Sequence, residues 1–128
     1  MLLDTNIIIE LFKGDVKLSD YLDKQSVVYI PSIVLGELYL GAYRSANTAK
    51  NIKKIRSLME RCTILAVDEE TADHFGAIKA ELLKKGKPIP ENDIWIAAIA
   101  KQYDLQTLTN DKHFKNVPGI KVKYLGQY

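Results

Sequence analysis

Apolar residues along this chain recur in two patterns. Short runs rich in Val, Ile, Leu and Thr predict five strands, at Leu2–Leu3, Val27–Ile30, Thr63–Ala66, Leu105–Leu108 and, with an edge-like character, Lys121–Tyr124. Longer stretches with apolar residues three or four positions apart predict five helices, at Thr5–Lys13, Ser32–Arg44, Thr48–Arg61, Glu69–Lys85 and Glu91–Tyr103. Strands that alternate with helices are typical of an α/β domain, so we expect a mostly parallel central sheet flanked by helices.

Glycine and proline mark where several of these elements end. Gly14 and Gly86 stand just past the predicted ends of the first and fourth helices. The segment GKPIP, residues 86–90, cannot continue a helix across its prolines. Since no internal repeat or linker interrupts the pattern, we expect one domain over residues 1–128.

Composition sets broad limits on what the chain can be. At 47% hydrophobic residues it can build its own core, and its net charge of +2 permits an anionic partner without requiring one. Cys62 is the only cysteine, which excludes an intramolecular disulfide and a thiolate zinc cage, and we expect it to be a small buried side chain. No apolar run approaches the length of a membrane span, and no secretory signal pattern opens the chain. We therefore expect a soluble, cytoplasmic protein with no membrane partner.

Carboxylates in apolar surroundings are the informative residues. Residues three and four positions apart share a helix face, and Glu37 has Ile33, Val34, Leu40 and Gly41 at those spacings. This places Glu37 on the side of its helix that is predicted to face the core. An ionised carboxylate is costly there unless a cation or several hydrogen-bond donors compensate its charge.

Two further acids stand in comparable places. Asp93 shares its face with Ile96, Ala97 and Ala100, and Asp4 shares its face with an apolar stripe of Ile7, Ile8 and Leu11. A fourth acid, Asp111, follows the fourth predicted strand directly. Because the carboxyl ends of parallel strands open into one crevice, we expect all four acids to meet at that edge of the sheet.

Four clustered carboxylates repel one another unless a cation lies among them. His74 and His113 fall outside the predicted pattern and no second cysteine exists, so the expected ligands are all oxygens, which favours Mg²⁺ or Mn²⁺ over zinc. Such an ion can activate a water and stabilise a leaving oxygen. Hydrolysis of a phosphodiester is the chemistry that this arrangement suits.

Each acid also has a local explanation. Asp4 can cap the first helix, Asp93 can interact with the dipole of its helix, and Asp111 after Asn110 can be an ordinary turn residue. The local explanation is weakest for Glu37, because an acid in the N-terminal half of a helix still prefers a solvated face. The coincidence of all four favours the metal site.

In their order and spacing, these motifs resemble those of the PIN-domain ribonucleases of the VapC toxin family. The matching segments cover nearly the whole chain and read DTN, PSIVLGELYLGA, GKPIPENDIWIAAIA, LTNDKHF and VPGIKV. The resemblance implies a PIN-like three-layer fold and an endoribonuclease that depends on Mg²⁺ or Mn²⁺, with Asp4, Glu37, Asp93 and Asp111 around the metal. It also implies supporting roles for Asn6, which orients Asp4 or a water, and for Thr109, which hydrogen-bonds within the cluster.

The resemblance also implies partners. It points to a structured RNA such as tRNA as substrate, to a homodimer, and to an antitoxin protein whose tail crosses the active-site groove. An apolar groove between the first helices would support the last of these, with the candidate lining residues Leu11, Phe12, Leu35, Tyr39 and Tyr43. The alternative is that these five side chains simply form core.

Basic residues near the acids are candidates for holding RNA. The segment from Arg44 to Arg61 carries six basic residues against the single acid Glu60, and Lys112 lies beside Asp111. From these we select Arg44, Lys53, Lys54 and Lys112 as candidate phosphate contacts. An ordinary solvated helix face is the alternative.

Two other classes of protein remain as alternatives. An aspartyl-phosphate enzyme or receiver domain would use Asp4 as a nucleophile, but a phosphatase of this kind wants a second acid two residues on, where Asn6 stands, and it leaves Glu37 unexplained. A catalytically silent RNA- or protein-binding module would be expected to lack one or more of the four acids. Metal-dependent cleavage of RNA by an activated water is the hypothesis that uses all four.

Overall fold

The protein is described by a computed structural model of all 128 residues, and its centre is a parallel β-sheet. Every neighbouring pair of strands is parallel, and the order across the sheet is β3-β2-β1-β4-β5. The strands are short: β1 (Leu2–Leu3), β2 (Tyr29–Pro31), β3 (Thr63–Leu65), β4 (Gln106–Thr109) and β5 (Lys121–Tyr124).

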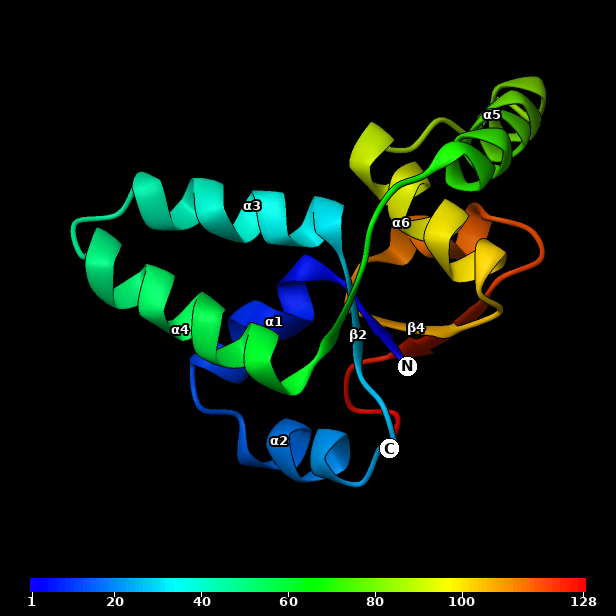
Figure 1. Ribbon diagram of the computed structural model, residues 1–128. Helices are drawn as coiled ribbons and strands as arrows, with labels where there is room; N and C mark the ends of the chain where they lie inside the picture. The colour runs from blue at the N-terminus through cyan, green and yellow to red at the C-terminus, as the bar shows by residue number, and fades with distance from the viewer.

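Six α-helices cover the two faces of this sheet. They are α1 (Thr5–Phe12), α2 (Val16–Asp23), α3 (Ser32–Tyr43), α4 (Thr48–Arg61), α5 (Glu69–Lys84) and α6 (Glu91–Gln102). In Figure 1, α1, α3 and α4 lie on one side of the strands and α5 and α6 on the other, which makes three layers. None of the helices is long and apolar enough to cross a bilayer. The predicted α/β class with a parallel, helix-flanked sheet is confirmed.

Burial of the central strand and of α6 explains why a sheet of such short strands is stable. Leu2 and Leu3 of β1 are fully buried, as expected for a central strand covered by helices on both faces. Helix α6 is buried along most of its length, with Ile96 and Ile99 inaccessible to solvent. Aliphatic packing against β1 from both layers therefore fixes the middle of the sheet.

The chain changes direction across the sheet next to β1. It runs from β1 to β2 and β3 on one side, and then returns through α5 and α6 to place β4 on the other side of β1. A crevice forms at the carboxyl ends of strands where the order reverses in this way. Here that crevice lies beyond Leu3 and Thr109.

Most element boundaries differ from the predicted ones by a residue or two. Strand β2 is Tyr29–Pro31 rather than Val27–Ile30, and four helices end at or just before the residue predicted, with Lys13, Arg44, Lys85 and Tyr103 acting as C-caps. The segment 86–90 is not helical, as its prolines required.

Two elements were not predicted. Helix α2 begins after Asp15, whose side chain accepts a hydrogen bond from the backbone N–H of Leu18, and it buries only Leu18 and Leu22. The 3₁₀ helix η1 (Lys112–Asn116) follows β4 and is anchored by buried Phe114. Both elements are too short to display a clear helical period.

Candidate active site

Asp4 lies at the end of β1 and is only 3% exposed. One carboxylate oxygen, Oδ1, accepts the backbone N–H of Thr5 at 2.8 Å, so Asp4 does cap α1. The other, Oδ2, accepts the hydroxyl of Thr109 at 2.7 Å and the side-chain amide of Asn6 at 3.1 Å. Capping and a place in the site are thus not alternatives, because the three bonds hold this carboxylate in one orientation in the crevice.

Thr109 and Asn6 join the ends of β1 and β4. The Thr109 hydroxyl, fully buried, donates to Asp4 and accepts the backbone N–H of Asp111 at 2.9 Å. The side-chain carbonyl of Asn6 accepts the backbone N–H of Asn110 at 2.9 Å. Both supporting residues named from the sequence therefore lie within the cluster, and they fix the loop that carries Asp111.

Asp93 lies in the first turn of α6 and is 9% exposed. Ile96, Ala97 and Ala100 are buried along the same face, as the spacing predicted. Burial, followed by the negative charges of Asp111 and Asp4, raises the pKa of Asp93 to about 6. Asp93 therefore lies close enough to Asp111 and Asp4 for their negative charges to repel its own.

Asp111 caps the 3₁₀ helix that follows β4, and its Oδ1 accepts the backbone N–H of His113 at 2.8 Å. This turn brings the His113 ring back over the acids. Its Nδ1 lies 3.1 Å from Oδ2 of Asp93 and 2.9 Å from Oδ1 of Asp111. The expectation that His113 falls outside the site was wrong, since sequence spacing gave no sign of this turn.

Glu37, in the middle of α3, is half-buried. Its Oε1 accepts a long hydrogen bond of 3.5 Å from the side-chain amide of Asn92. The predicted apolar face is only partly correct: Val34 is buried, but Leu40 is 58% exposed. Glu37 therefore faces the crevice rather than the core, although burial, with the charge of Asp4, still raises its pKa.

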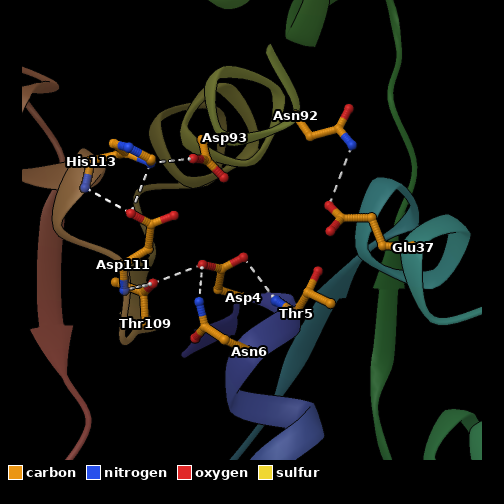
Figure 2. A network of polar contacts seen from close by, with 9 residues as sticks. All are labelled: Asp4, Thr5, Asn6, Glu37, Asn92, Asp93, Thr109, Asp111 and His113. Carbon is orange, nitrogen blue, oxygen red and sulfur yellow. Dashed lines mark hydrogen bonds and ion pairs between the residues drawn. The ribbon is translucent and has the colours of Figure 1, made fainter. Parts of the chain in front are cut away.

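The four carboxylates come together from four elements, as the sequence predicted. Figure 2 shows Asp4, Asp93 and Asp111 pointing toward one another and Glu37 facing them from α3. Burial raises the pKa of Asp4 as well, and the neighbouring charge of Asp111 adds to the effect. Removing this repulsion requires a cation or protons.

The donor groups fit a divalent cation. One ligand atom each from Asp93, Asp111 and His113 lies within 4.8 Å of the others, which is a separation that a single ion can bridge. On the Glu37 side, the buried hydroxyl of Thr5 has no hydrogen-bond partner and points toward Glu37 (Figure 2). Polar groups left unpaired in this way are what a bound ion or water would satisfy.

The candidate phosphate contacts are distributed unevenly. Lys112 begins η1 next to Asp111, and Lys54 lines a groove of about 340 Å³ that also contains Thr5 and Glu37. Lys53 is exposed on α4, and Arg44 lies exposed at the C-terminal end of α3, the end farther from the sheet in Figure 1. Two of the four candidates are thus near the acids.

The groove differs in detail from the expected one. It lies between α1, α3 and α4, and of the five predicted lining residues only Phe12 belongs to it. Leu35 is core, Tyr39 donates its hydroxyl to the sulfur of Met59 at 3.5 Å, and Tyr43 is 67% exposed. The sequence identified an apolar surface on these helices but not which side chains open it.

Comparisons with known proteins agree with this architecture. The family model described as PIN domain matches residues 1–120. Ribonuclease VapC2 of Haemophilus influenzae is 39% identical over 125 residues, or 95% of each chain. The tRNA(fMet)-specific endonuclease VapC of Shigella flexneri is 33% identical over 127 residues, again 95% of each chain.

A solved structure is similar over the same length. The structure of VapBC2 from Rickettsia felis, bound to a DNA fragment from their promoter, has a TM-score of 0.92, with 29% identity and 97% coverage of both chains. The resemblance inferred from the short motifs therefore extends to the whole fold. The chain belongs to the PIN domain family and, within it, to the VapC ribonucleases.

Proposed function

We propose that this protein is a metal-dependent endoribonuclease and the toxin of a toxin–antitoxin pair. The observation that carries the proposal is the convergence of Asp4, Glu37, Asp93 and Asp111, from four separate elements, on the crevice beside β1. Relatives named ribonuclease or endonuclease share the fold over nearly its full length, which supports the same class of reaction.

In this proposal the four carboxylates hold Mg²⁺ or Mn²⁺. When bound, such an ion lowers the pKa of an attacking water and stabilises the oxygen that leaves phosphorus. Asp4 is oriented for this by the Thr109 hydroxyl and the Asn6 amide, so its position costs no reorganisation when RNA arrives. Burial on β1 and α6 keeps Asp4 and Asp93 dry on their inner sides, which strengthens their attraction for a cation.

The nucleophile alternative, with Asp4 attacking phosphorus, fits the geometry less well. Both Asp4 oxygens already accept hydrogen bonds, and Asn6 uses its amide to orient Asp4 and its carbonyl to hold the next loop. Glu37 would have no function in that reaction. A silent binding module is likewise disfavoured, because all four acids are in place.

The substrate we propose is a structured RNA such as tRNA, a choice supported by the name of the Shigella relative. Lys112 follows Asp111 directly and Lys54 lines the groove that contains Glu37, so both would neutralise phosphates near the cleaved bond. We assign Lys53 and Arg44 to a more distant track, where they would add affinity without affecting the chemistry.

The partner we propose is a cognate antitoxin seated in the groove between α1, α3 and α4, in a protein that forms a homodimer in the cytoplasm. Support comes from the VapBC complex, whose toxin-like chain shares this fold. Ile9, Phe12 and Ile55 contribute to the apolar lining of the groove, and Glu37 also lines it. A helix laid in this groove would extend toward the acids and cover them.

The deciding experiment is cleavage of structured RNAs, including initiator tRNA, by the purified full chain. Mg²⁺ or Mn²⁺ should support endonucleolytic cuts and EDTA should abolish them, while Asp4→Asn and Asp93→Asn should each lower the rate by at least a hundred-fold. Glu91→Gln is the matched control, because this acid begins the same helix as Asp93 but pairs with Lys79 at 3.3 Å, away from the site. Activity that survives EDTA or either Asp→Asn change would reject the proposal, and a hydroxylamine-labile phosphoenzyme would favour the nucleophile alternative.

The antitoxin site can be tested with Ile9→Asp. Ile9 is 43% exposed in the groove and supplies no polar group to the site, so RNA cleavage should be retained while inhibition by the co-encoded antitoxin weakens at least ten-fold. Val16→Asp, on α2 outside this groove, is the control and should leave inhibition unchanged. Equal inhibition of both variants would place the antitoxin elsewhere.

A further inference from the structure

His113 supplies the one nitrogen atom at the cluster of acids that could be a metal ligand. Its Nδ1 lies within 3.1 Å of Asp93 Oδ2 and 2.9 Å of Asp111 Oδ1, although one nitrogen can give only one proton to two carboxylates. The ring is held there by a turn, because the Asp111 carboxylate also accepts the His113 backbone N–H. The backbone turn therefore helps to hold the ring in this position, in addition to the contacts that the ring itself makes.

Packing does not account for the position of this ring. The side chain of His113 is 48% exposed, whereas the next residue, Phe114, is buried and anchors the 3₁₀ helix. The other histidine offers a contrast: His74 on α5 is more buried, at 28% exposed, and the acid that it approaches is Glu70, at 3.9 Å. The two site carboxylates and the turn closed by Asp111, rather than packing, therefore determine where this ring lies.

The three groups form a donor set of two oxygens and one nitrogen. Their ligand atoms lie within 4.8 Å of one another, so one ion can contact all three. Imidazole is a ligand of transition-metal ions, with Mn²⁺ bound less strongly than Fe²⁺ or Zn²⁺, whereas Mg²⁺ prefers oxygen ligands and holds them in near-ideal octahedral geometry. A nitrogen in the set therefore changes which ion the site prefers.

We propose that His113 binds the divalent ion directly through Nδ1, alongside Asp93 and Asp111, and that this makes the site prefer Mn²⁺ to Mg²⁺. The proposal rests on the proposed function only in taking the acids to be a metal site. In the metal-bound protein the ring proton would be on Nε2, which would leave Nδ1 free to bind the ion, and Asp93 and Asp111 would contribute one oxygen each. Asp4 and Glu37 would add negative charge around the ion.

The proposal predicts a selective loss on mutation. His113→Gln removes a ring nitrogen but keeps a polar side chain, so Mn²⁺ affinity should fall roughly ten-fold or more while Mg²⁺ affinity changes less than about three-fold. His74→Gln is the matched control and should change neither. Calorimetric titration of the full chain with each ion alone gives both affinities without any RNA.

Pulsed electron paramagnetic resonance of bound Mn²⁺ tests the ligand itself. The wild-type protein and His74→Gln should show coupling of the manganese electron spin to a ¹⁴N nucleus, and His113→Gln should lose it while its circular dichroism spectrum stays native. Tight Mn²⁺ binding without ¹⁴N coupling in the wild type would overturn the role of His113 and leave the carboxylate metal site standing. Mn²⁺ and Mg²⁺ binding that Asp93→Asn does not weaken would instead overturn the metal site, and the proposed function with it.

Discussion

At the scale of single residues, Thr109 has the most consequential position. Its one hydroxyl donates to Asp4 and accepts from the backbone of Asp111, so it links two acids that come from different strands. The same strand carries Thr107, which is also fully buried but whose hydroxyl has no hydrogen-bond partner. Two buried threonines two residues apart thus differ only in what their hydroxyls contact.

Thr109→Val should therefore lower both the stability of the protein and its rate of RNA cleavage, and Thr107→Val should lower neither. Loss of the Thr109 hydroxyl removes a donor from a buried carboxylate, which should cost about 1–3 kcal/mol of unfolding free energy. RNA cleavage should fall roughly 10–100-fold, the usual effect of losing a group that orients a metal ligand. Thr107→Val should be neutral or slightly stabilising, because an unpaired hydroxyl is replaced by a methyl. Urea denaturation and cleavage rates measure both effects, and equal losses would mean that Thr109 acts only through packing.

The raised pKa values of the clustered acids make the stability of the folded protein depend on pH. The folded-state pKa of Asp93 is raised from 3.8 to about 6, so the folded protein binds this proton more tightly than the unfolded chain does. Stability from this group is then greatest below about pH 4 and is lost as pH rises through about 6. The pKa of Asp4 and of Glu37 is raised in the same direction, mainly by burial, and reinforces the trend.

In buffer with EDTA, Asp93→Asn should consequently stabilise the protein at pH 7 and not at pH 4. The expected gain is about 1–2 kcal/mol, less than the full value of roughly 3 kcal/mol for such a shift, because solvent reaches one side of the carboxylate. Chemical denaturation at pH 4, 5, 6 and 7 measures the slope of stability for both proteins. A slope that is unchanged by the substitution would show that Asp93 is not the group responsible.

The sequence located the acids but not everything around them. Asp4, Glu37 and Asp93 could be found because a carboxylate in an apolar stripe is an exception that the sequence itself shows, and Asp111 could be found because it follows a predicted strand directly. His113 violates no such pattern, since its approach to Asp93 depends on a 3₁₀ turn closed by Asp111. Thr5 was missed for the same reason: its unpaired hydroxyl is recognised only from burial.

At the scale of elements, long helices were predictable and short ones were not. Helix α4 spans Thr48–Arg61, as predicted, because fourteen residues show several turns of apolar spacing. Helix α2 has eight residues and buries two, so only its cap at Asp15 and the pair Leu18 and Leu22 could have indicated it. Strand β2 shifts toward Pro31 because its register is set by pairing with β1 and β3, which no local pattern encodes.

The start of α5 is fixed by a capping box that reaches another helix. Asp68 accepts the backbone N–H of Thr71, and the Thr71 hydroxyl accepts the backbone N–H of Asp68 at 3.1 Å. Thr71, fully buried, also contacts the side chain of Gln102 at the end of α6, and Gln102 donates to Asp68. This small network ties α5 to the helix that carries Asp93.

Thr71→Val should therefore destabilise the fold by about 1–2 kcal/mol, because it breaks the box and leaves the side-chain carbonyl of Gln102 without its donor. Metal affinity should be nearly unchanged, since the network lies at the opposite end of α6 from Asp93. Thr63→Val, an exposed threonine at the start of β3 with no side-chain hydrogen bond, is the control for the substitution itself. Thermal denaturation measures the loss of stability, and a control as destabilised as Thr71→Val would argue against the network.

At the scale of the whole molecule, the site exists because the chain reverses its direction across the sheet at β1. Asp4 and Asp111 follow β1 and β4, which are adjacent in space but separated by about a hundred residues of sequence, and α3 and α6 bring Glu37 and Asp93 from opposite layers. This convergence could be inferred from the rule for parallel sheets, whereas the individual distances could not. One ion bound by these acids should therefore join both layers of the fold.

Metal binding should consequently stabilise the entire protein and not only the crevice. An ion that binds the folded state alone, at a hundred times its dissociation constant, adds about 2.7 kcal/mol, which for a chain of this size corresponds to a rise in Tm on the order of 10 °C. Differential scanning calorimetry should show this rise with Mn²⁺ in the wild type and in Glu91→Gln, and its loss on addition of EDTA. In Asp4→Asn and in Glu37→Gln, which lie in different elements, the rise should be reduced, because each substitution removes one of the charges that the ion joins. A full rise in Glu37→Gln alone would mean that α3 takes no part in binding the ion, and Glu37 would then have to act on RNA or on the attacking water instead.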